Sequence, residues 1–189
     1  MNTELEKEIQ QVIENINYKY HTNFSSIDEM DMLPQSDVGD FSEDFIREFK
    51  DKIDWKSVVY YKKILSDDFI REFQHKMGWK SMSVCQKLPE NIIREFKDKV
   101  DWESISIYQT LSEDFIREFQ DKVDWDFVSE HQKLSENFIR EFQDRVDWDC
   151  IYAKQRLSEN FRMEIQEKHE IDMENVLILQ GKVPMEYFI

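Results

Sequence analysis

Apolar and polar positions repeat along most of this chain with a period of 23 residues. A slightly longer first copy begins at Phe41, and later copies begin at Leu65, Leu88, Leu111, Leu134 and Leu157. Self-similarity at a short fixed period is typical of proteins built from stacked modules. The pattern therefore predicts an array of about six repeats over residues 41–180.

The first half of each repeat has the pattern of an amphipathic helix. In one copy, Phe115, Phe119 and Val123 fall at i, i+4 and i+8, which predicts one apolar stripe on a helix of roughly three turns. Glu118 and Lys122 are expected to form an i,i+4 pair on the solvated face. A serine can cap each helix, at Ser42, Ser66, Ser112, Ser135 and Ser158, and Pro89 at this position is also compatible with a helix start.

The second half of each repeat predicts a shorter helix that begins at tryptophan. The caps are Asp54, Asp101, Asp124 and Asp147, which precede Trp55, Trp102, Trp125 and Trp148. The inward positions three residues later are Val58, Met82, Ile105, Val128 and Ile151. Two such short helices cannot bury their apolar faces alone, so neighbouring repeats must stack. The fold predicted is an all-α solenoid of two-helix repeats with atypical caps at both ends, in which the tryptophans belong to the core.

The two ends of the chain depart from the repeat. Residues 1–40 predict an acidic capping helix over 4–19, followed by an irregular surface connection over 21–40 that is partly packed through Phe24 and Met30. Residues 181–189 predict a C-terminal cap, with a truncated further repeat start at 183–186. We expect Tyr187, Phe188 and Ile189 to cover the exposed end of the stack.

Charge narrows the classes of partner. The formal net charge is −16, from 41 acidic and 25 basic side chains, which disfavours binding to nucleic acid or anionic lipid and favours a protein partner with a basic surface. Cys85 and Cys150 occupy non-equivalent positions of different repeats, which argues against a disulfide framework. The absence of such a framework is typical of proteins in a reducing cytosol. No apolar run reaches the roughly 20 residues needed to span a bilayer. We therefore expect a soluble cytoplasmic protein.

Two strings carry a resemblance to a known class of repeat. Phe-Ile-Arg-Glu-Phe occurs at 45–49, 69–73, 115–119 and 138–142, and Asp-Lys-Val-Asp-Trp occurs at 98–102 and 121–125. They resemble the short helical repeats encoded by large DNA viruses of amoebae and by some bacteriophages. The resemblance covers about residues 41–180. It implies a helical array of viral or phage origin, acting in the host cytoplasm, and supplies no catalytic residues.

No constellation in the sequence indicates catalysis. The four histidines occur in different contexts without metal-ligand spacing, and no glycine-rich phosphate loop or nucleophile elbow is present. We therefore expect no enzyme activity, no metal and no cofactor. The repeated arginines are expected to form a ladder of ion pairs between repeats; these are Arg47, Arg71, Arg94, Arg117 and Arg140.

Candidate binding residues are those that vary at one register, because repeat scaffolds keep packing constant and diversify the exposed surface. The second helices carry this variation. The candidate partner-binding residues are Tyr60, Tyr61, Val84, Ile107, Tyr108, Glu130, His131, Tyr152 and Lys154.

The repeated acids form a second candidate surface, an acidic ridge that could imitate a phosphate backbone. Its residues are Glu43, Asp44, Asp67, Asp68, Glu113, Asp114, Asp121 and Asp144. The simpler interpretation is that these acids cap helices and keep the protein soluble.

Three functions follow from these patterns. The leading hypothesis is a non-enzymatic protein-binding scaffold that inhibits or redirects a host protein. The first alternative is an acidic mimic of nucleic acid that blocks a nucleic-acid-binding defence enzyme. The second alternative is a structural protein that assembles with itself, through an imperfect terminal cap.

Overall fold

The computed structural model describes residues 3–182, and this part of the chain is helical without any strand. It divides into two compact units, one ending at Ile92 and the other beginning at Ile93. The first unit contains α1 (Thr3–Tyr20), the short 3₁₀ helices η1 (Ile27–Glu29) and η2 (Gln35–Asp40), then α2 (Glu43–Glu48), α3 (Trp55–Tyr61), α4 (Asp67–Phe73) and α5 (Trp79–Cys85), with α6 (Glu90–Glu95) at the boundary. The second contains α7 (Trp102–Tyr108), α8 (Glu113–Glu118), α9 (Trp125–His131), α10 (Glu136–Glu141), α11 (Trp148–Lys154), α12 (Glu159–Lys168) and α13 (Met173–Leu179).

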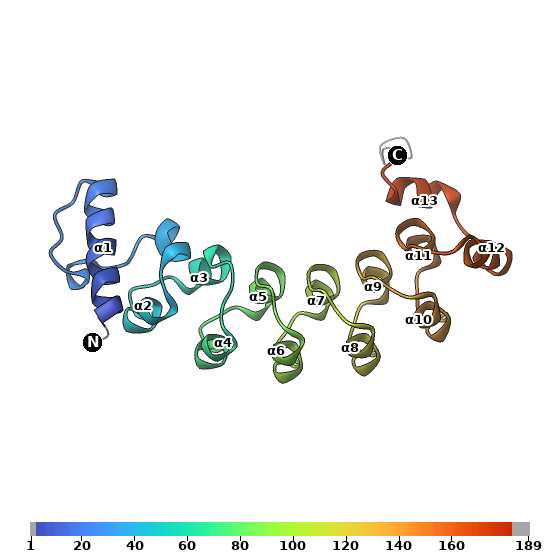
Figure 1. The fold of residues 1–189 in the computed structure, drawn as a ribbon, viewed down its shortest axis with the longest axis horizontal. Coiled ribbons are helices and arrows are strands. Elements are labelled where there is room, and N and C mark those ends of the chain that lie inside the picture. The colour runs from blue at the N-terminus through green and yellow to red at the C-terminus, as the bar shows by residue number, and fades with distance from the viewer. Residues whose placement is uncertain (1–2, 183–189) are drawn as a thin grey trace. The chain divides into compact units, whose positions relative to one another are not determined.

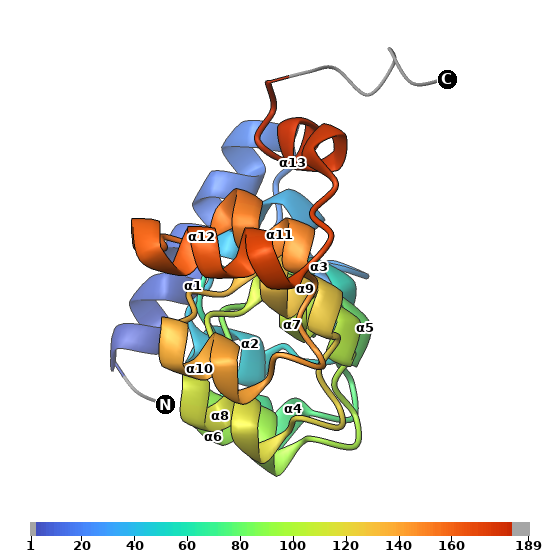
Figure 2. The same cartoon turned by 90° about the vertical axis from the view of Figure 1, so that its right-hand side faces the viewer.

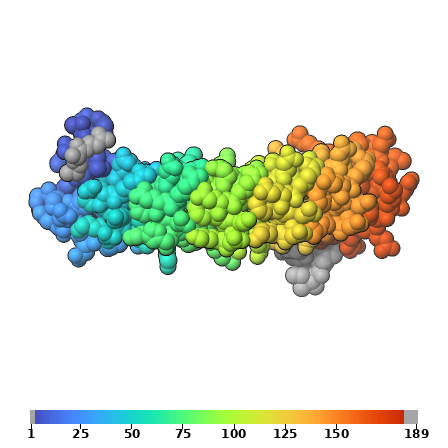
Figure 3. Space-filling view, turned by 90° about the horizontal axis from the view of Figure 1, so that it is seen from below, coloured from blue at the N-terminus to red at the C-terminus, as the bar shows by residue number. Residues whose placement is uncertain are grey.

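These helices form an α-solenoid of two-helix repeats, as the period predicts. In the second unit, α7, α9 and α11 form one row, and α8 and α10 form the other (Figure 1). Within each unit, atoms of successive repeats lie against one another on the face shown in Figure 3. The core lies between the rows and includes the fully buried rings of Phe115 and Phe138.

The first helix is shorter than predicted in every repeat before the last, namely in α2, α4, α6, α8 and α10. The side chain of Ser112 caps α8 by accepting a hydrogen bond from the backbone N–H of Phe115 at 3.2 Å. The three-turn prediction is wrong, because the backbone leaves the helical region at Phe119 (φ −112°, ψ 29°). Val123 is still buried, but it reaches the core from the following turn.

The early end of the helix also changes the expected surface ion pair. Glu118 and Lys122 do not share a helix. Glu118 instead accepts from Nε of Arg94 at 2.7 Å, and Lys122 lies 3.2 Å from the carboxylate of Asp98. Each partner comes from the preceding repeat, so surface charges that were expected to stabilise one helix connect neighbouring repeats instead.

The second helices match their prediction. Asp124 caps α9 by accepting from the backbone N–H groups of Asp126 and Phe127, and Val128 is completely buried. The sequence predicts the tryptophans in the core, but each is only half-buried, at the edge of the boundary between two repeats. The Trp125 ring packs on Phe142 of the next repeat, with centroids 4.9 Å apart, and its indole nitrogen donates to the carbonyl of Gln120 at 2.9 Å.

A buried glutamine fixes the register between second helices. Gln132 follows α9 and donates from Nε2 to the carbonyls of Ser106 and Gln109, both at 2.8 Å. Its Oε1 accepts from the backbone N–H of Leu111 at 3.0 Å. Gln155 makes the equivalent three hydrogen bonds one repeat later. These polar side chains are buried and satisfied, so they tie each repeat to the preceding one.

Residues 3–40 form an atypical repeat at the start of the first unit. Glu8 of α1 accepts hydrogen bonds from Ser42, just as Glu43 of α2 accepts them from Ser66. Lys62 occupies the glutamine position and donates to the carbonyls of Gly39 and Phe41. Helix α1 therefore takes the place of a first helix, and η2 takes the place of a second helix.

Residues 21–40 are more ordered than the irregular, partly packed surface connection that the sequence predicts. Four apolar side chains of this segment are buried, namely Ile27, Met30, Leu33 and Val38. The segment forms the two short helices η1 and η2, and η2 packs against α3. Within it, Phe24 is half-buried and Met30 is buried, in agreement with the sequence.

The last repeat of the second unit ends on a longer helix. Helix α12 continues to Lys168, after which His169 stacks on Trp148 with ring centroids 3.8 Å apart. Asp172 then caps α13, which packs against α11 (Figure 2). The cap predicted from Tyr187, Phe188 and Ile189, and the truncated repeat start at 183–186, lie outside the described residues.

Candidate functional site

Successive repeats are connected by Arg47, Arg94, Arg117 and Arg140, as predicted, and Arg71 pairs with Asp67 and Asp68 of its own helix. Nε of Arg117 lies 2.9 Å from Oε2 of Glu141 in the next repeat, and its guanidinium also covers the ring of Phe138 at 5.0 Å. The hydrogen bond to Glu141 raises the pKa of Arg117. Equivalent pairs join Arg47 to Glu72, Arg94 to Glu118 and Arg140 to Glu164. The arginines of these pairs already bind glutamates of the next repeat, which leaves little of their charge for binding an external anion.

Most acids of the proposed ridge are also engaged. Glu113 accepts from the backbone N–H of Ser135 at 2.6 Å, and Asp114 pairs with Arg117 at 2.9 Å. In the first unit Glu43 accepts from the backbone N–H of Ser66 and Asp44 pairs with Arg47. Asp67 and Asp68 both pair with Arg71, and Asp121 of the second unit pairs with Arg145. Asp144 is exposed. The neighbouring arginines offset part of the negative charge of the paired aspartates. This favours the simpler interpretation, in which the acids cap helices and join repeats.

The candidate partner-binding residues differ in how far they reach the surface. Exposed fractions are 71% for Tyr60, 48% for Tyr61, 40% for Val84 and 57% for Tyr108. His131 and Lys154 are also exposed, whereas Ile107, Glu130 and Tyr152 are half-buried.

Tyr152 is half-buried because its register faces the neighbouring repeat. The position equivalent to Tyr152 holds a buried serine in three repeats, at Ser83, Ser106 and Ser129, and the buried Val59 in the first repeat. The hydroxyl of Ser106 donates to the carbonyl of Trp102 at 2.8 Å and accepts from the backbone N–H of Asp124 at 3.0 Å. The Tyr152 ring is covered by the guanidinium of Arg162, which lies 4.9 Å from its centroid.

In the second unit, the polar candidates are held by one another. Nζ of Lys154 lies 3.8 Å from Glu130 and donates to the carbonyl of Leu179, and Nε2 of His131 lies 3.6 Å from Glu130. These three side chains line a hollow of about 310 Å³. All three have partners within the chain, and the hollow is also lined by the exposed basic side chains of Lys133 and Arg156.

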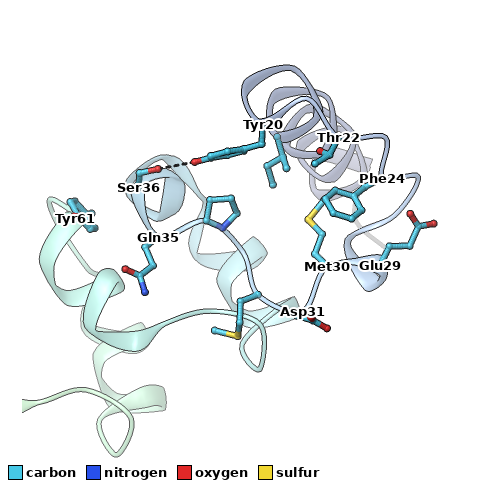
Figure 4. Close-up of a pocket in the computed structure, with 12 residues that line it drawn as sticks. Tyr20, Thr22, Phe24, Glu29, Met30, Asp31, Gln35, Ser36 and Tyr61 are labelled. Carbon is cyan, nitrogen blue, oxygen red and sulfur yellow. Dashed lines mark hydrogen bonds between the residues drawn. The ribbon is translucent and has the colours of Figure 1, made fainter.

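The first unit contains a larger cleft, to which we refer as the N-terminal cleft. It has a volume of about 840 Å³ and lies between the end of α1, the connection over 22–36 and α3. Figure 4 shows Tyr20 reaching toward Ser36 and Met30 beside Phe24, with Tyr61 projecting from α3. Tyr20, Met32 and Tyr61 are exposed at its walls, with 43%, 52% and 48% of their surfaces accessible.

Hydrogen bonds fix the walls of the N-terminal cleft from both sides. The side-chain amide of Asn17 donates to the carbonyl of Phe24, and its oxygen accepts from the Phe24 N–H, both at 2.8 Å. On the other side, Nζ of Lys52 donates to the carbonyl of Met30 at 2.7 Å, and the N–H of Leu33 donates to the Lys52 carbonyl at 2.8 Å. The connection is therefore attached to α1 and to the first repeat.

The charges at the N-terminal cleft have one sign. Glu29 and Asp31 are its two charged lining residues in the described part of the chain, and both are exposed. Hydrogen bonds from the side chain and backbone of Ser25 lower the pKa of Glu29, so its carboxylate is charged at neutral pH. Residues 21–40 contain five Asp or Glu side chains and no Lys or Arg.

The lysines near the N-terminal cleft donate to Asp37 or to backbone carbonyls, or line another hollow. Lys19 pairs with Asp37 at 2.5 Å, Lys52 donates to backbone carbonyls, and Lys62 donates to the carbonyls of Gly39 and Phe41. Lys63 lines a separate hollow of about 380 Å³ beside Ile64. No lysine or arginine is among the described residues that line the cleft, although Nζ of Lys52 donates to the carbonyl of Met30, between Glu29 and Asp31.

A neighbouring hollow extends this surface along α3. It has a volume of about 720 Å³ and is lined by Tyr60, Tyr61 and Gln35, together with Lys56 and Lys76. Tyr61 and Gln35 also line the N-terminal cleft, so the two depressions share a wall. The Tyr60 and Tyr61 rings meet edge to face with centroids 5.3 Å apart. Together these residues form an exposed aromatic surface, defined here by Tyr20, Met32, Tyr60 and Tyr61.

Among residues 3–182, no three His, Cys, Asp or Glu side chains gather where they could hold a metal ion. Burial and the neighbouring Asp147 carboxylate raise the pKa of the Cys150 thiol to about 12, so this sulfur is a poor nucleophile. Helices of this part of the chain also lack the length and apolar content required to cross a bilayer.

Sequence reasoning found Tyr60 and Tyr61 but missed Tyr20 and Met32 as surface residues. Tyr20 lies in a helix whose apolar spacing gave no reason to separate it from the packed face, and Met32 lies in an irregular stretch. The absence of Lys and Arg over residues 21–40 was the one sequence signal that set this segment apart from the repeats. Met32 lies between Met30 and Leu33, whose backbone groups hydrogen-bond to Lys52, and no local pattern indicates these contacts.

No family model, curated protein or solved structure matches this chain.

Proposed function

We propose that this chain is a non-enzymatic scaffold that binds another protein through the exposed aromatic surface of its first unit. The observation that supports this function most directly is the exposed pair Tyr60 and Tyr61, which lines a depression of about 720 Å³; Tyr61 also lines the N-terminal cleft of about 840 Å³. Tyrosine is enriched at the energetic centres of protein interfaces, because it combines a large apolar ring with a hydroxyl group.

The division of labour among the side chains supports a binding role. The repeated polar residues are engaged in joining repeats, as Arg117 does with Glu141 and Gln132 with Ser106. Among the exposed large apolar side chains, Tyr60, Tyr61, Val84 and Tyr108 lie at positions that vary between repeats, whereas Tyr20 and Met32 precede the first repeat. A scaffold that keeps its packing constant and varies its surface is suited to recognition. The resemblance to viral and phage repeats extends the proposal to a host protein that is inhibited or redirected.

Neither alternative function has a comparable surface behind it. Mimicry of nucleic acid requires free negative charge along the repeats, whereas Asp114 and Asp121 pair with arginines. Self-assembly through the C-terminal tail concerns residues outside the described part of the chain. Light scattering over a concentration series separates self-assembly from the binding scaffold, because the scaffold is expected to remain monomeric.

The function can be tested by selecting random peptides from a display library on the intact protein. Sequences enriched on the wild-type protein are expected to lose about tenfold or more in affinity for a Tyr60→Ser/Tyr61→Ser variant. Tyr108→Ser is the matched control, because Tyr108 is exposed at the same register as Tyr61 but does not line the N-terminal cleft. Failure to enrich any sequence, or equal binding to all three proteins, would contradict the proposed function.

A further inference from the structure

We infer that the N-terminal cleft binds a basic peptide segment of the partner, with an apolar side chain between Tyr20, Met32 and Tyr61 and a Lys or Arg side chain beside Asp31. This inference rests on the proposed function and specifies the chemistry of the partner at one place. It concerns a segment of chain and not a small molecule, because the cleft shares Tyr61 and Gln35 with the hollow along α3. That hollow is lined by Lys56 and Lys76, so the basic side chain of the segment is assigned to the Asp31 side of the cleft only.

The apolar part of the inference comes from the walls of the cleft. Its volume of about 840 Å³ lies in the usual range of ligand sites, roughly 300–1,000 Å³. Its base includes the buried side chains of Ile16 and Met30, while Met32 is exposed at the wall. Methionine is flexible and polarisable, so it can pack against apolar side chains of different shape. An apolar side chain that entered here would cover Tyr20 and Tyr61 together.

The basic part of the inference comes from charge complementarity. Glu29 and Asp31 are the charged residues that line the cleft in the described part of the chain. Lys52 is not among the lining residues, but its ammonium binds the carbonyl of Met30 and offsets part of their negative charge. A Lys or Arg side chain of a partner would meet two carboxylates without displacing an internal cation. An acidic segment would meet repulsion at the same place. Complementary charge of this kind selects between partners more strongly than it adds affinity.

The cleft is also organised before a partner arrives. Asn17 and Lys52 hold the connection on its two sides through hydrogen bonds of 2.7 to 2.8 Å. The hydroxyls of Tyr20 and Ser36 lie 3.2 Å apart and join α1 to η2. Walls that are already held in place lose less conformational freedom on binding, so a short segment can bind measurably.

The inference is tested with three labelled 12-residue peptides and fluorescence anisotropy. One peptide contains Lys and Leu, one contains Glu and Leu, and one contains Lys and Ser. The wild-type protein is expected to bind the Lys/Leu peptide at least tenfold more tightly than the other two, because only this peptide has both the charge and the apolar side chains. Equal binding of the Lys/Ser or Glu/Leu peptide would overturn the inference.

Charge reversals locate the binding. Asp31→Lys and Asp144→Lys change the net charge of the protein equally, and both positions are exposed. Asp31→Lys is expected to lower the affinity of the protein for the Lys/Leu peptide about tenfold, whereas Asp144→Lys is expected to change this affinity less than twofold. Equal weakening by both variants would show diffuse attraction, and no weakening by either would place the peptide elsewhere; both results overturn the inference.

A second variant tests the apolar wall without changing charge. Met32→Ser is expected to weaken the Lys/Leu peptide several-fold, with circular dichroism unchanged from the wild type, and an unaltered affinity would contradict the assigned wall. The proposed function is judged separately by the display selection. If that selection returns acidic or neutral peptides that still require Tyr60 and Tyr61, the function stands and the basic segment is excluded.

Discussion

Gln132 donates a hydrogen bond of 2.8 Å to the backbone carbonyl of Ser106, a residue 26 positions earlier in the chain. Since Gln132 is buried, water cannot replace this bond. The same side chain also binds Gln109 and Leu111, so one amide satisfies three backbone groups at the junction of two repeats. This explains how short helices keep a single register along the second unit.

Removal of this amide is expected to destabilise the protein strongly. Gln132→Leu keeps the approximate size of the side chain but leaves buried backbone groups without partners, at a cost of about 2–4 kcal/mol in the free energy of unfolding. Urea denaturation followed by circular dichroism measures this change. Gln143→Ala is the control, because Gln143 is exposed and its substitution is expected to stay within about 0.5 kcal/mol. Equal effects at the two positions would contradict the role assigned to Gln132.

The serine caps give a graded prediction. The hydroxyl of Ser135 accepts from the backbone N–H of Phe138 at 3.2 Å at the start of α10. Ser135→Ala is expected to lower the free energy of unfolding by about 1 kcal/mol, and Ser135→Gly by only a few tenths, because glycine is tolerated as a cap. Thermal or chemical denaturation of the two variants gives the order, and a larger loss in Ser135→Gly than in Ser135→Ala would be inconsistent with capping.

Acid is expected to destabilise the repeats. Hydrogen bonds from the backbone and the hydroxyl of Ser158 lower the pKa of Glu136 below its ordinary value of 4.5. A carboxylate with a depressed folded-state pKa contributes stability that is complete above the unfolded value and lost as pH falls through the folded value. The free energy of unfolding should therefore fall below about pH 4.5. A Glu136→Gln variant should be less stable at neutral pH and show a shallower acid dependence, as denaturation curves at several pH values can establish.

Two glycines predict opposite outcomes. A Cβ at Gly39 would lie 3.0 Å from the backbone oxygen of Tyr61, so Gly39→Ala is expected to destabilise the first unit by about 1–3 kcal/mol. Gly78 occupies the cap position that holds Asp in other repeats, and its nearest neighbour would be 3.9 Å away. Gly78→Asp is therefore expected to stabilise the protein by a few tenths of a kcal/mol. Thermal unfolding of both variants tests the pair, and a stabilising Gly39→Ala would refute the close approach.

Features set by local chemistry were predictable from the sequence. The repeat period and the caps at Ser112 and Asp124 depend on residues a few positions apart, and the structure confirms them. The end of the first helix was not predictable, because Phe119 continues the apolar spacing even though its backbone leaves the helix. The register of Tyr152 was also hidden, since the variation between repeats does not distinguish a position that faces solvent from one that faces a neighbour.

The candidate site was predictable only in part. Tyr60 and Tyr61 were identified by variation at one register. The N-terminal cleft beside them depends on contacts between distant positions, such as Lys52 with Met30 and Glu8 with Ser42. These contacts make α1 and η2 act as an atypical repeat, and they bring Tyr20 and Met32 to the surface near Tyr61. No pattern of spacing within residues 21–40 encodes that arrangement.

Hydrogen–deuterium exchange with a peptide selected on the intact protein tests the central claim most directly. If the exposed aromatic surface binds partners, the peptide should slow exchange at the end of α1, over residues 22–36 and in α3. Exchange in α9 and α11 should remain unchanged, although these helices belong to the same kind of repeat. Slower exchange confined to α9 and α11, or no change over residues 16–61, would contradict the account.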